Sequence, residues 1–220
     1  MCYSLETSVI AAFGLAVVGV VTVYKAVRFD RRMLVFACFP LIFSVHQLVE
    51  SVVWYSLGHP FAGDQTFRYI YTVIAFLLWP VLTPFAAAAT ENDAGRKRIW
   101  MRMCGCGIVV ALYLSAKLAG ADGINVSVVN HSLAYDPLFD RPPPIADLVY
   151  LALTVVPLAS LDNRALNLFG VVVFMSFVYA IVEASAAWYS VWCLSAAAFS
   201  VIIFFAIREG ESAALDEASM

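Results

Sequence analysis

The apolar segment 34–57 carries three polar side chains whose types and spacing could support chemistry. His46 and Glu50 are four residues apart, and Gln47 lies three residues before Glu50, so a helix would place them on or beside one face. Trp54 follows four residues later along that face. An imidazole and a carboxylate at this spacing can hold one metal ion. The same pair can instead clamp a ligand, relay protons, or hydrogen-bond to each other and to neighbouring helices.

Three further residues are candidates for the same chemistry. Cys2 becomes the first residue when Met1 is removed, and its thiolate and free amine could chelate zinc or copper, because thiolate is a soft ligand. His131 lies in the long connection 119–144, where a histidine is more often solvated than functional. Glu183 ends an apolar segment and is a candidate for contacting a substrate.

The composition decides what kind of protein must position these residues. Of 220 residues, 63% are hydrophobic and only 13% are charged, and the mean hydropathy is +0.86. An ordinary soluble domain has about 25% charged residues, and one of this size could not bury so much apolar surface. The sequence therefore predicts an integral membrane protein and excludes soluble globular, disordered and nucleic-acid-binding classes.

Seven apolar segments approach the roughly 20 residues that a helix needs to cross a bilayer. They are 8–27, 34–57, 69–89, 99–119, 145–160, 165–184 and 188–207. The fifth is the shortest. We expect an all-α bundle of seven transmembrane helices in one domain, 1–208, followed by a disordered acidic tail, 209–220.

Basic residues set the expected orientation. Under the seven-helix arrangement, ten of the 13 Lys and Arg residues fall on one side of the membrane: Lys25, Arg28, Arg31, Arg32, Arg96, Lys97, Arg98, Arg102, Arg164 and Arg208. Cytoplasmic loops carry such an excess of positive charge. The sequence thus predicts a multi-pass protein of the cell membrane with its N-terminus outside and its C-terminus inside.

This topology gathers the candidate residues in the outer half of the membrane. At a rise of about 1.5 Å per residue, Glu50 would lie about 10 Å and His46 about 16 Å below the outer boundary. A charged side chain at such depth costs about 2.5–3.5 kcal/mol on insertion scales, so it needs a partner or a function. Lys117, at the outer end of the segment 99–119, is one candidate partner for Glu50.

Four short motifs resemble an uncharacterised family of bacterial polytopic membrane proteins whose members open Met-Cys-Phe-Ser. The matching segments are Met1-Cys2-Tyr3-Ser4, Gln47-x-x-Glu50 to Trp54, Trp79-Pro80 with Pro84, and Ser190-Val191-Trp192-Cys193. In that family the position of His46 is often glutamine, which favours Glu50 as the central residue. The resemblance implies a shared fold and importance for Cys2 and Glu50, but it names no activity.

These observations support three classes of function. In the first, Cys2, His46, Glu50 and His131 bind zinc or copper, or Glu50 acts instead as the catalytic acid or base. The reaction would be hydrolysis of a membrane lipid or lipid-like ligand by metal-bound water, with Gln47, Trp54 and Glu183 contacting the substrate. No HExxH motif accompanies this set.

The second class is a carrier or channel for a small molecule or an ion, with Glu50 as its coupling carboxylate. Its weakness is the scarcity of ionisable residues in the inner half of the segments. The third is a seven-helix ligand sensor. A retinal photoreceptor is excluded because 188–207 contains no lysine for a Schiff base.

Overall fold

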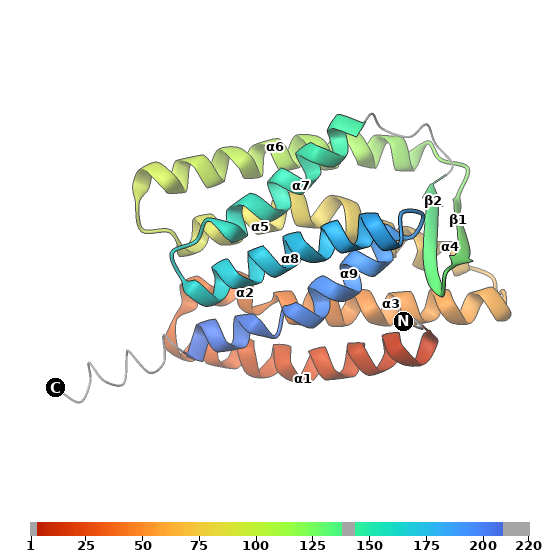
Figure 1. Cartoon of the computed structure of the whole chain (residues 1–220), viewed down its shortest axis with the longest axis horizontal. Helices are drawn as coiled ribbons and strands as arrows, with labels where there is room; N and C mark the ends of the chain where they lie inside the picture. Colours follow the sequence, from red (N-terminus) through yellow and green to blue (C-terminus); the bar gives the residue numbers. More distant parts are fainter. Residues whose placement is uncertain (1–3, 138–143, 209–220) are drawn as a thin grey trace.

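Long apolar helices lie side by side in the computed structural model, and a β-hairpin covers one end of the bundle (Figure 1). The structure describes residues 4–137 and 144–208, so Cys2 and the acidic tail 209–220 lie outside the described residues. The helices are α1 (Leu5–Phe29), η1 (Arg31–Met33), α2 (Leu34–Ala37), α3 (Phe39–Gly58), α4 (Asp64–Val73), η2 (Ile74–Leu78), α5 (Trp79–Thr90), α6 (Ala94–Ala119), α7 (Pro144–Ala159), α8 (Arg164–Glu183) and α9 (Trp188–Phe199). The strands are β1 (Ile124–Val129) and β2 (Ser132–Pro137).

Six helical stretches in the described chain are long and apolar enough to cross a membrane. They are Leu5–Phe29, Arg31–Gly58, Asp64–Thr90, Ala94–Ala119, Arg164–Glu183 and Trp188–Arg208. Each overlaps one of the segments expected from hydropathy, which supports a helical multi-pass membrane protein. The remaining segment corresponds to α7, whose apolar part, Ile145–Ala159, is shorter. Whether α7 crosses the membrane as a seventh span stays a prediction.

Helix α1 shows how an apolar helix serves both lipid and protein. Ile10, Phe13 and Val17 are 72%, 68% and 67% exposed on the surface of the bundle. Such exposure suits hydrocarbon, because lipid tails are as apolar as these side chains. The opposite face packs on α3, and a Cβ added at Gly19 would lie 2.6 Å from the side chain of Leu41. Glycine therefore lets the two helices approach closely.

A π-helical segment interrupts the third long stretch. Segment η2 lies just before Pro80, which has no backbone N–H to donate to a carbonyl one turn earlier. The Ala75 carbonyl instead accepts a hydrogen bond of 2.5 Å from the Tyr150 hydroxyl of α7. π-Bulges frequently occur at functional sites. Here the hydrogen bond from Tyr150 fastens α7 to the π-helical segment.

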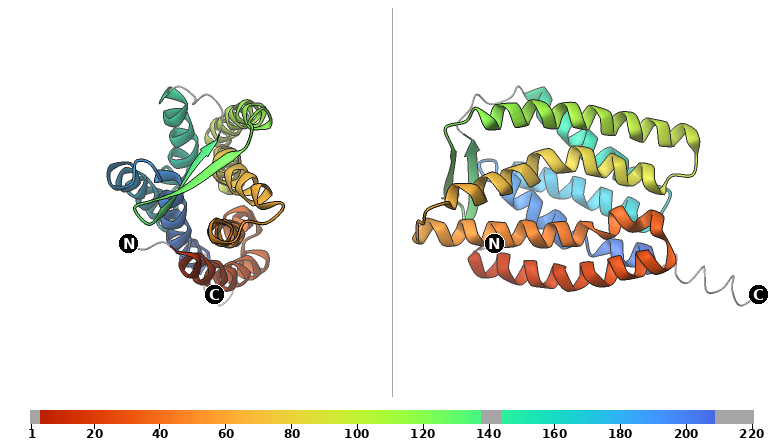
Figure 2. Two further views of the ribbon diagram at one scale, coloured as in Figure 1. Left: turned by 90° about the vertical axis from the view of Figure 1, so that its right-hand side faces the viewer. Right: turned by 180° about the vertical axis from the view of Figure 1, so that it is seen from behind.

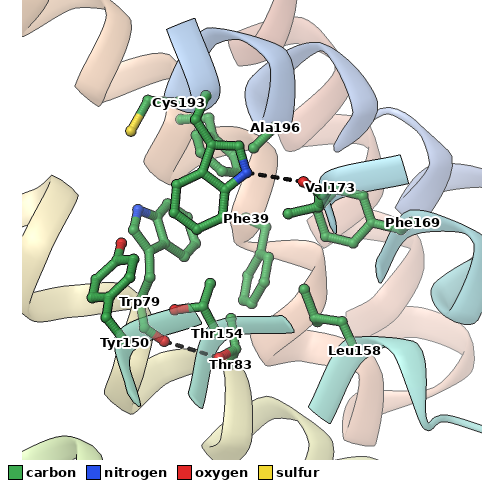
Figure 3. Close-up of a pocket in the computed structure, with 12 residues that line it drawn as sticks. Phe39, Trp79, Thr83, Tyr150, Thr154, Leu158, Phe169, Val173, Cys193 and Ala196 are labelled. Carbon is green, nitrogen blue, oxygen red and sulfur yellow. Dashed lines mark hydrogen bonds between the residues drawn. The ribbon is translucent and has the colours of Figure 1, made fainter. Parts of the chain in front are cut away.

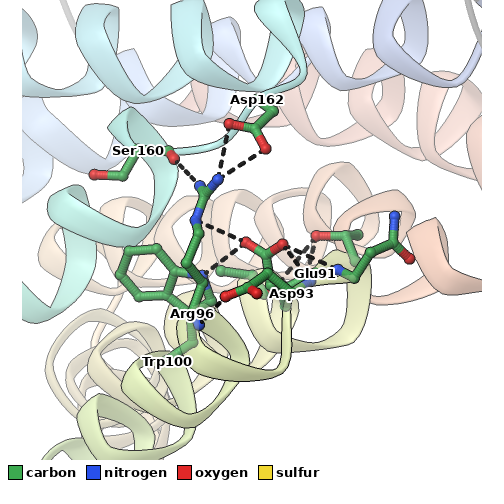
Figure 4. A network of polar contacts seen from close by, with 10 residues as sticks. Glu91, Asp93, Arg96, Trp100, Ser160 and Asp162 are labelled. Carbon is green, nitrogen blue, oxygen red and sulfur yellow. Dashed lines mark hydrogen bonds and ion pairs between the residues drawn. The ribbon is translucent and has the colours of Figure 1, made fainter.

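The basic residues gather at the end of the bundle opposite the hairpin, which we call the basic end. Arg96 forms ion pairs with Glu91 at 3.0 Å and Asp162 at 2.8 Å (Figure 4). Arg32 donates a hydrogen bond of 2.6 Å to the Asn92 side chain. These contacts link the α5–α6 connection to the α7–α8 connection and to η1. The shared placement fits the charge bias, while the side of the membrane that this end faces stays a prediction.

The connection 119–144, expected to be a loop, contains the antiparallel hairpin of β1 and β2. Val129 pairs with Ser132, leaving Asn130 and His131 as a two-residue turn. Both turn residues have positive φ, 48° and 60°, as a type I′ turn requires. The hairpin lies across the bundle when it is viewed end on (Figure 2). We call this end of the molecule the hairpin end.

Candidate functional site

Glu50 lies inside the bundle on α3 and is only 2% exposed. Its Oε2 accepts a hydrogen bond of 2.9 Å from Gln47 Nε2, one turn earlier on the same helix. Its Oε1 accepts one of 2.5 Å from the Ser190 hydroxyl of α9. Among the described residues no Lys or Arg pairs with it, so the expected partner Lys117 is not its counter-ion. Within the described part of the chain, the carboxyl group is therefore hydrogen-bonded but has no Lys or Arg partner.

Three stacked rings lead from the Glu50 helix to the hairpin. The ring of His46, fully buried, lies 4.2 Å between centroids from that of Tyr71 on α4. Tyr71 in turn stacks on Tyr135 of β2 at 4.0 Å, with the planes only 3° apart. The Tyr71 hydroxyl is within electrostatic reach of Glu50. The three rings therefore connect α3 to the hairpin, beside the helix face that carries Glu50.

The residues around Glu50 leave several buried polar atoms without a hydrogen-bond partner. These atoms are His46 Nδ1 and Nε2, Gln47 Oε1, Tyr71 Oη and Tyr135 Oη. Buried polar groups are nearly always paired with protein or water, since leaving one unpaired costs about 1–3 kcal/mol. We call Glu50, Gln47, Ser190, His46, Tyr71 and Tyr135 the Glu50 cluster. Its composition suits a small polar species that would satisfy these atoms.

Tyr135 belongs to the hairpin and keeps its proton at neutral pH. Burial, followed by the negative charge of Glu50, raises the pKa of the Tyr135 hydroxyl well above its usual value, and Arg68 opposes this weakly. The hydroxyl is therefore a permanent hydrogen-bond donor at the edge of the Glu50 cluster.

A pocket of about 600 Å³ lies beneath the hairpin, and we call it the hairpin pocket. It is lined by residues of α4, η2, α6, both strands, α7, the α8–α9 connection and the start of α9. Its aromatic lining is Phe76, Tyr113, Tyr135, Tyr150, Trp188 and Tyr189. Its polar lining is Thr72, Ser127, Asp136, Asp147 and Ser185, and its aliphatic lining is Leu77, Val110, Leu114, Leu118, Val129, Ala134, Ile145, Ala146, Val149 and Ala186. Because Tyr135 also belongs to the Glu50 cluster, the two sites adjoin.

A second, much smaller cavity of about 30 Å³ lies in the middle of the bundle (Figure 3). Its walls are mostly rings and aliphatic side chains, and Trp192 Nε1 donates to the Val173 carbonyl at 2.9 Å beside it. Trp79 Nε1 and Thr154 Oγ1 have no hydrogen-bond partner there. One water needs about 10–15 Å³. The cavity is thus large enough for about two waters but not for an organic ligand.

The structure brings only some of the predicted site residues together. His46, Gln47 and Glu50 share the buried face of α3, as their spacing predicts. Trp54 lies about one turn beyond Glu50 on the same helix. It is half-buried and packs beneath the hairpin. Glu183 is exposed at the end of α8, and His131 is exposed in the hairpin turn.

The expected zinc or copper site does not form from the residues that can be placed. Within 4–137 and 144–208, no three His, Cys, Asp or Glu side chains are close enough to hold a metal ion. His46, Glu50 and His131 therefore do not make such a centre among themselves. Cys2, the fourth expected ligand, lies outside the described residues.

Three members of the Glu50 cluster were missed by reasoning from the sequence. Ser190 lies in the Ser-Val-Trp-Cys motif at 190–193, so a signal existed, but nothing in the motif indicates a carboxylate partner. Tyr71 and Tyr135 are aromatic residues in segments rich in aromatic residues. Only the docking of α4 and β2 against α3 identifies them.

Comparison with known proteins places the chain in a family. The model of a family of unknown function, DUF6629, matches residues 1–218, so the chain belongs to that family. No curated protein matches the chain. No solved structure matches it either.

Proposed function

We propose that this DUF6629 protein binds a lipid-like amphiphile in the hairpin pocket, on the outer side of the cell membrane. The observation that carries the proposal is the pocket itself, about 600 Å³ in volume and walled mainly by aromatic and aliphatic side chains. Sites for small organic ligands are concave, mostly apolar and about 300–1,000 Å³ in size. The volume and the walls both fit this description.

The arrangement of the lining suits a ligand with an apolar body and a polar end. Rings and aliphatic side chains from η2, α6 and α7 would cover the apolar body. Ser127 and Asp136 of the hairpin supply polar groups at the end of the bundle, where a headgroup could remain close to water. The hairpin would then act as a cover over the bound molecule.

Binding is favoured over passage by the packing deeper in the bundle. Phe36, Phe39 and Phe169 are at most 1% exposed in the core toward the basic end. The small cavity, which Phe39 and Phe169 help to line, holds no more than about two waters. A polar solute would find no open route there. These features support a binding protein or sensor more than a carrier.

Metal-dependent hydrolysis has less support than ligand binding. His46, Glu50 and His131 do not converge, so no reaction step is assigned to a zinc or copper ion. Glu50 also does not line the hairpin pocket. The three expected substrate contacts do not line the pocket either. Gln47 bonds to Glu50, and Trp54 and Glu183 lie elsewhere.

Filling the pocket tests the proposal. Ala134→Trp on β2 and Ala146→Trp on α7 each add a large ring to the pocket wall. Val17→Trp is the matched control, because Val17 is 67% exposed on the outside of α1. The protein would be reconstituted in nanodiscs and titrated with a fluorescent single-chain lipid, and copurifying lipids would be identified by native mass spectrometry.

We expect the wild type and Val17→Trp to bind the probe and both pocket variants to bind it at least tenfold more weakly. Circular dichroism and size-exclusion profiles would establish that all variants are folded. Equal binding by folded Ala134→Trp, Ala146→Trp and wild-type protein would contradict the proposal.

A further inference from the structure

We infer that the Glu50 cluster is a binding site for a monovalent metal cation of the sodium class, distinct from the hairpin pocket. Three observations lead to this inference: a buried carboxylate without a counter-charge, oxygen atoms without partners beside it, and a ring stack that joins it to the pocket.

Both carboxylate oxygens of Glu50 accept hydrogen bonds, an arrangement that favours the ionised form. Each carboxylate oxygen accepts one bond, from Gln47 and from Ser190. A negative charge that is 2% exposed requires compensation. Among the described residues no Lys or Arg supplies it.

The unpartnered atoms nearby are suitable ligands for a hard cation. Gln47 Oε1 is an amide oxygen without a donor, attached to the same group whose nitrogen bonds Glu50. The Tyr71 hydroxyl makes no hydrogen bond of good geometry, lies near Ser190, and is within electrostatic reach of the carboxylate. Oxygen donors of this kind suit hard cations, whereas zinc and copper favour nitrogen and sulfur.

The charge balance selects a single positive charge. One carboxylate neutralises one monovalent cation, while a divalent cation would leave a net buried charge and takes more carboxylates. The site differs from the expected zinc or copper centre in its ligands and its charge. The cluster adjoins the hairpin pocket, because Tyr135 belongs both to the cluster and to the wall of that pocket.

Cation-dependent stability and direct binding test the inference. Thermal unfolding of the purified protein would be followed in sodium, potassium or N-methylglucamine chloride at constant ionic strength, and ²²Na⁺ binding would be measured by equilibrium dialysis. The variants are Glu50→Gln, which removes the charge, and Tyr71→Phe, which keeps the stacked ring but removes an oxygen. Glu183→Gln is the control, since it removes an exposed carboxylate at the same end of the bundle.

We expect saturable ²²Na⁺ binding and a sodium-dependent rise of Tm in the wild type and in Glu183→Gln. Glu50→Gln should lose both, and Tyr71→Phe should bind at least tenfold more weakly while remaining folded. Probe binding in the hairpin pocket should persist in Glu50→Gln, which separates this site from the proposed function.

Two outcomes would overturn the inference. The first is a wild-type protein that shows no saturable ²²Na⁺ binding and whose Tm does not change with sodium. A Tm that changes only with pH belongs to this outcome, because it would indicate a proton in place of the cation. The second is sodium binding that persists in both Glu50→Gln and Tyr71→Phe.

Discussion

The hydroxyl of Ser190 donates a hydrogen bond to the Glu50 carboxylate across a separation of 140 residues in sequence. This bond joins α9 to α3 at the place where the bundle buries the Glu50 carboxyl group, which is 2% exposed. It also supplies one of the two donors that allow the carboxylate to remain inside a membrane protein. The pairing of these two residues therefore concerns both the stability of the bundle and the candidate cation site.

Ser190→Ala removes the donor to Glu50 and leaves a carboxylate oxygen unpaired. We expect the free energy of unfolding to fall by about 1.5–3 kcal/mol, the usual range for a hydrogen bond to a charged group. Ser195→Ala is the matched control on the same helix, because its hydroxyl bonds only to the Val191 carbonyl. Reversible unfolding in mixed detergent measures both. Equal stability of the two variants would show that the Glu50–Ser190 bond contributes little.

Tyr150→Phe removes the hydroxyl that satisfies the Ala75 carbonyl in the π-helical segment. We expect a loss of about 1–3 kcal/mol, because the carbonyl is then buried without a partner. Amide hydrogen exchange in Ile74–Leu78 should become faster than in the wild type. Tyr113→Phe, at a tyrosine that is 47% exposed, is the control and should change neither quantity. Unaltered exchange in Tyr150→Phe would mean that the bulge does not depend on α7.

The hairpin end should face the outside of the cell and the basic end the cytoplasm. A cysteine introduced at Asn130, in the hairpin turn, should react with a membrane-impermeant maleimide on intact cells. A cysteine at Asp162, 83% exposed at the basic end, should react only after the membrane is permeabilised. Both would be introduced into a background without native cysteines. The reverse pattern of labelling would refute the orientation and the placement of the pocket on the outer side.

Cys2 is still untested as a zinc or copper ligand, and such a centre at Glu50 would be the alternative to the monovalent cation proposed above. If its thiolate and amine complete a site with His46 and Glu50, purified protein should contain close to one zinc or copper ion per chain. Cys2→Ser should lose that metal without loss of folding, and Cys106→Ser, at an exposed cysteine of α6, should retain it. Elemental analysis by mass spectrometry measures the content. Less than a tenth of an ion per chain in the wild type would rule out the proposal.

The sequence by itself determined the class of the protein and the main spans. Apolar stretches long enough to cross a bilayer need only local information to be found, because a spanning segment must satisfy its own backbone as a helix. The shared face of His46, Gln47 and Glu50 was also predictable, since residues three and four apart on a helix are neighbours. The exception is α7, whose apolar part is too short for its length alone to show whether it crosses the membrane.

Only the tertiary structure decided what those residues meet. Ser190 reaches Glu50, and Tyr71 and Tyr135 continue the stack from His46, because α9, α4 and β2 dock at particular rotations around α3. In a soluble protein, the apolar face of a helix indicates which side turns toward the core. A helix that is apolar all round and lies in lipid gives no such indication. The hairpin was also not predicted. Its two strands pair with each other, and the surface on which they pack exists only after the helices have assembled. For this reason the pocket beneath it could not be foreseen from residue types and spacing.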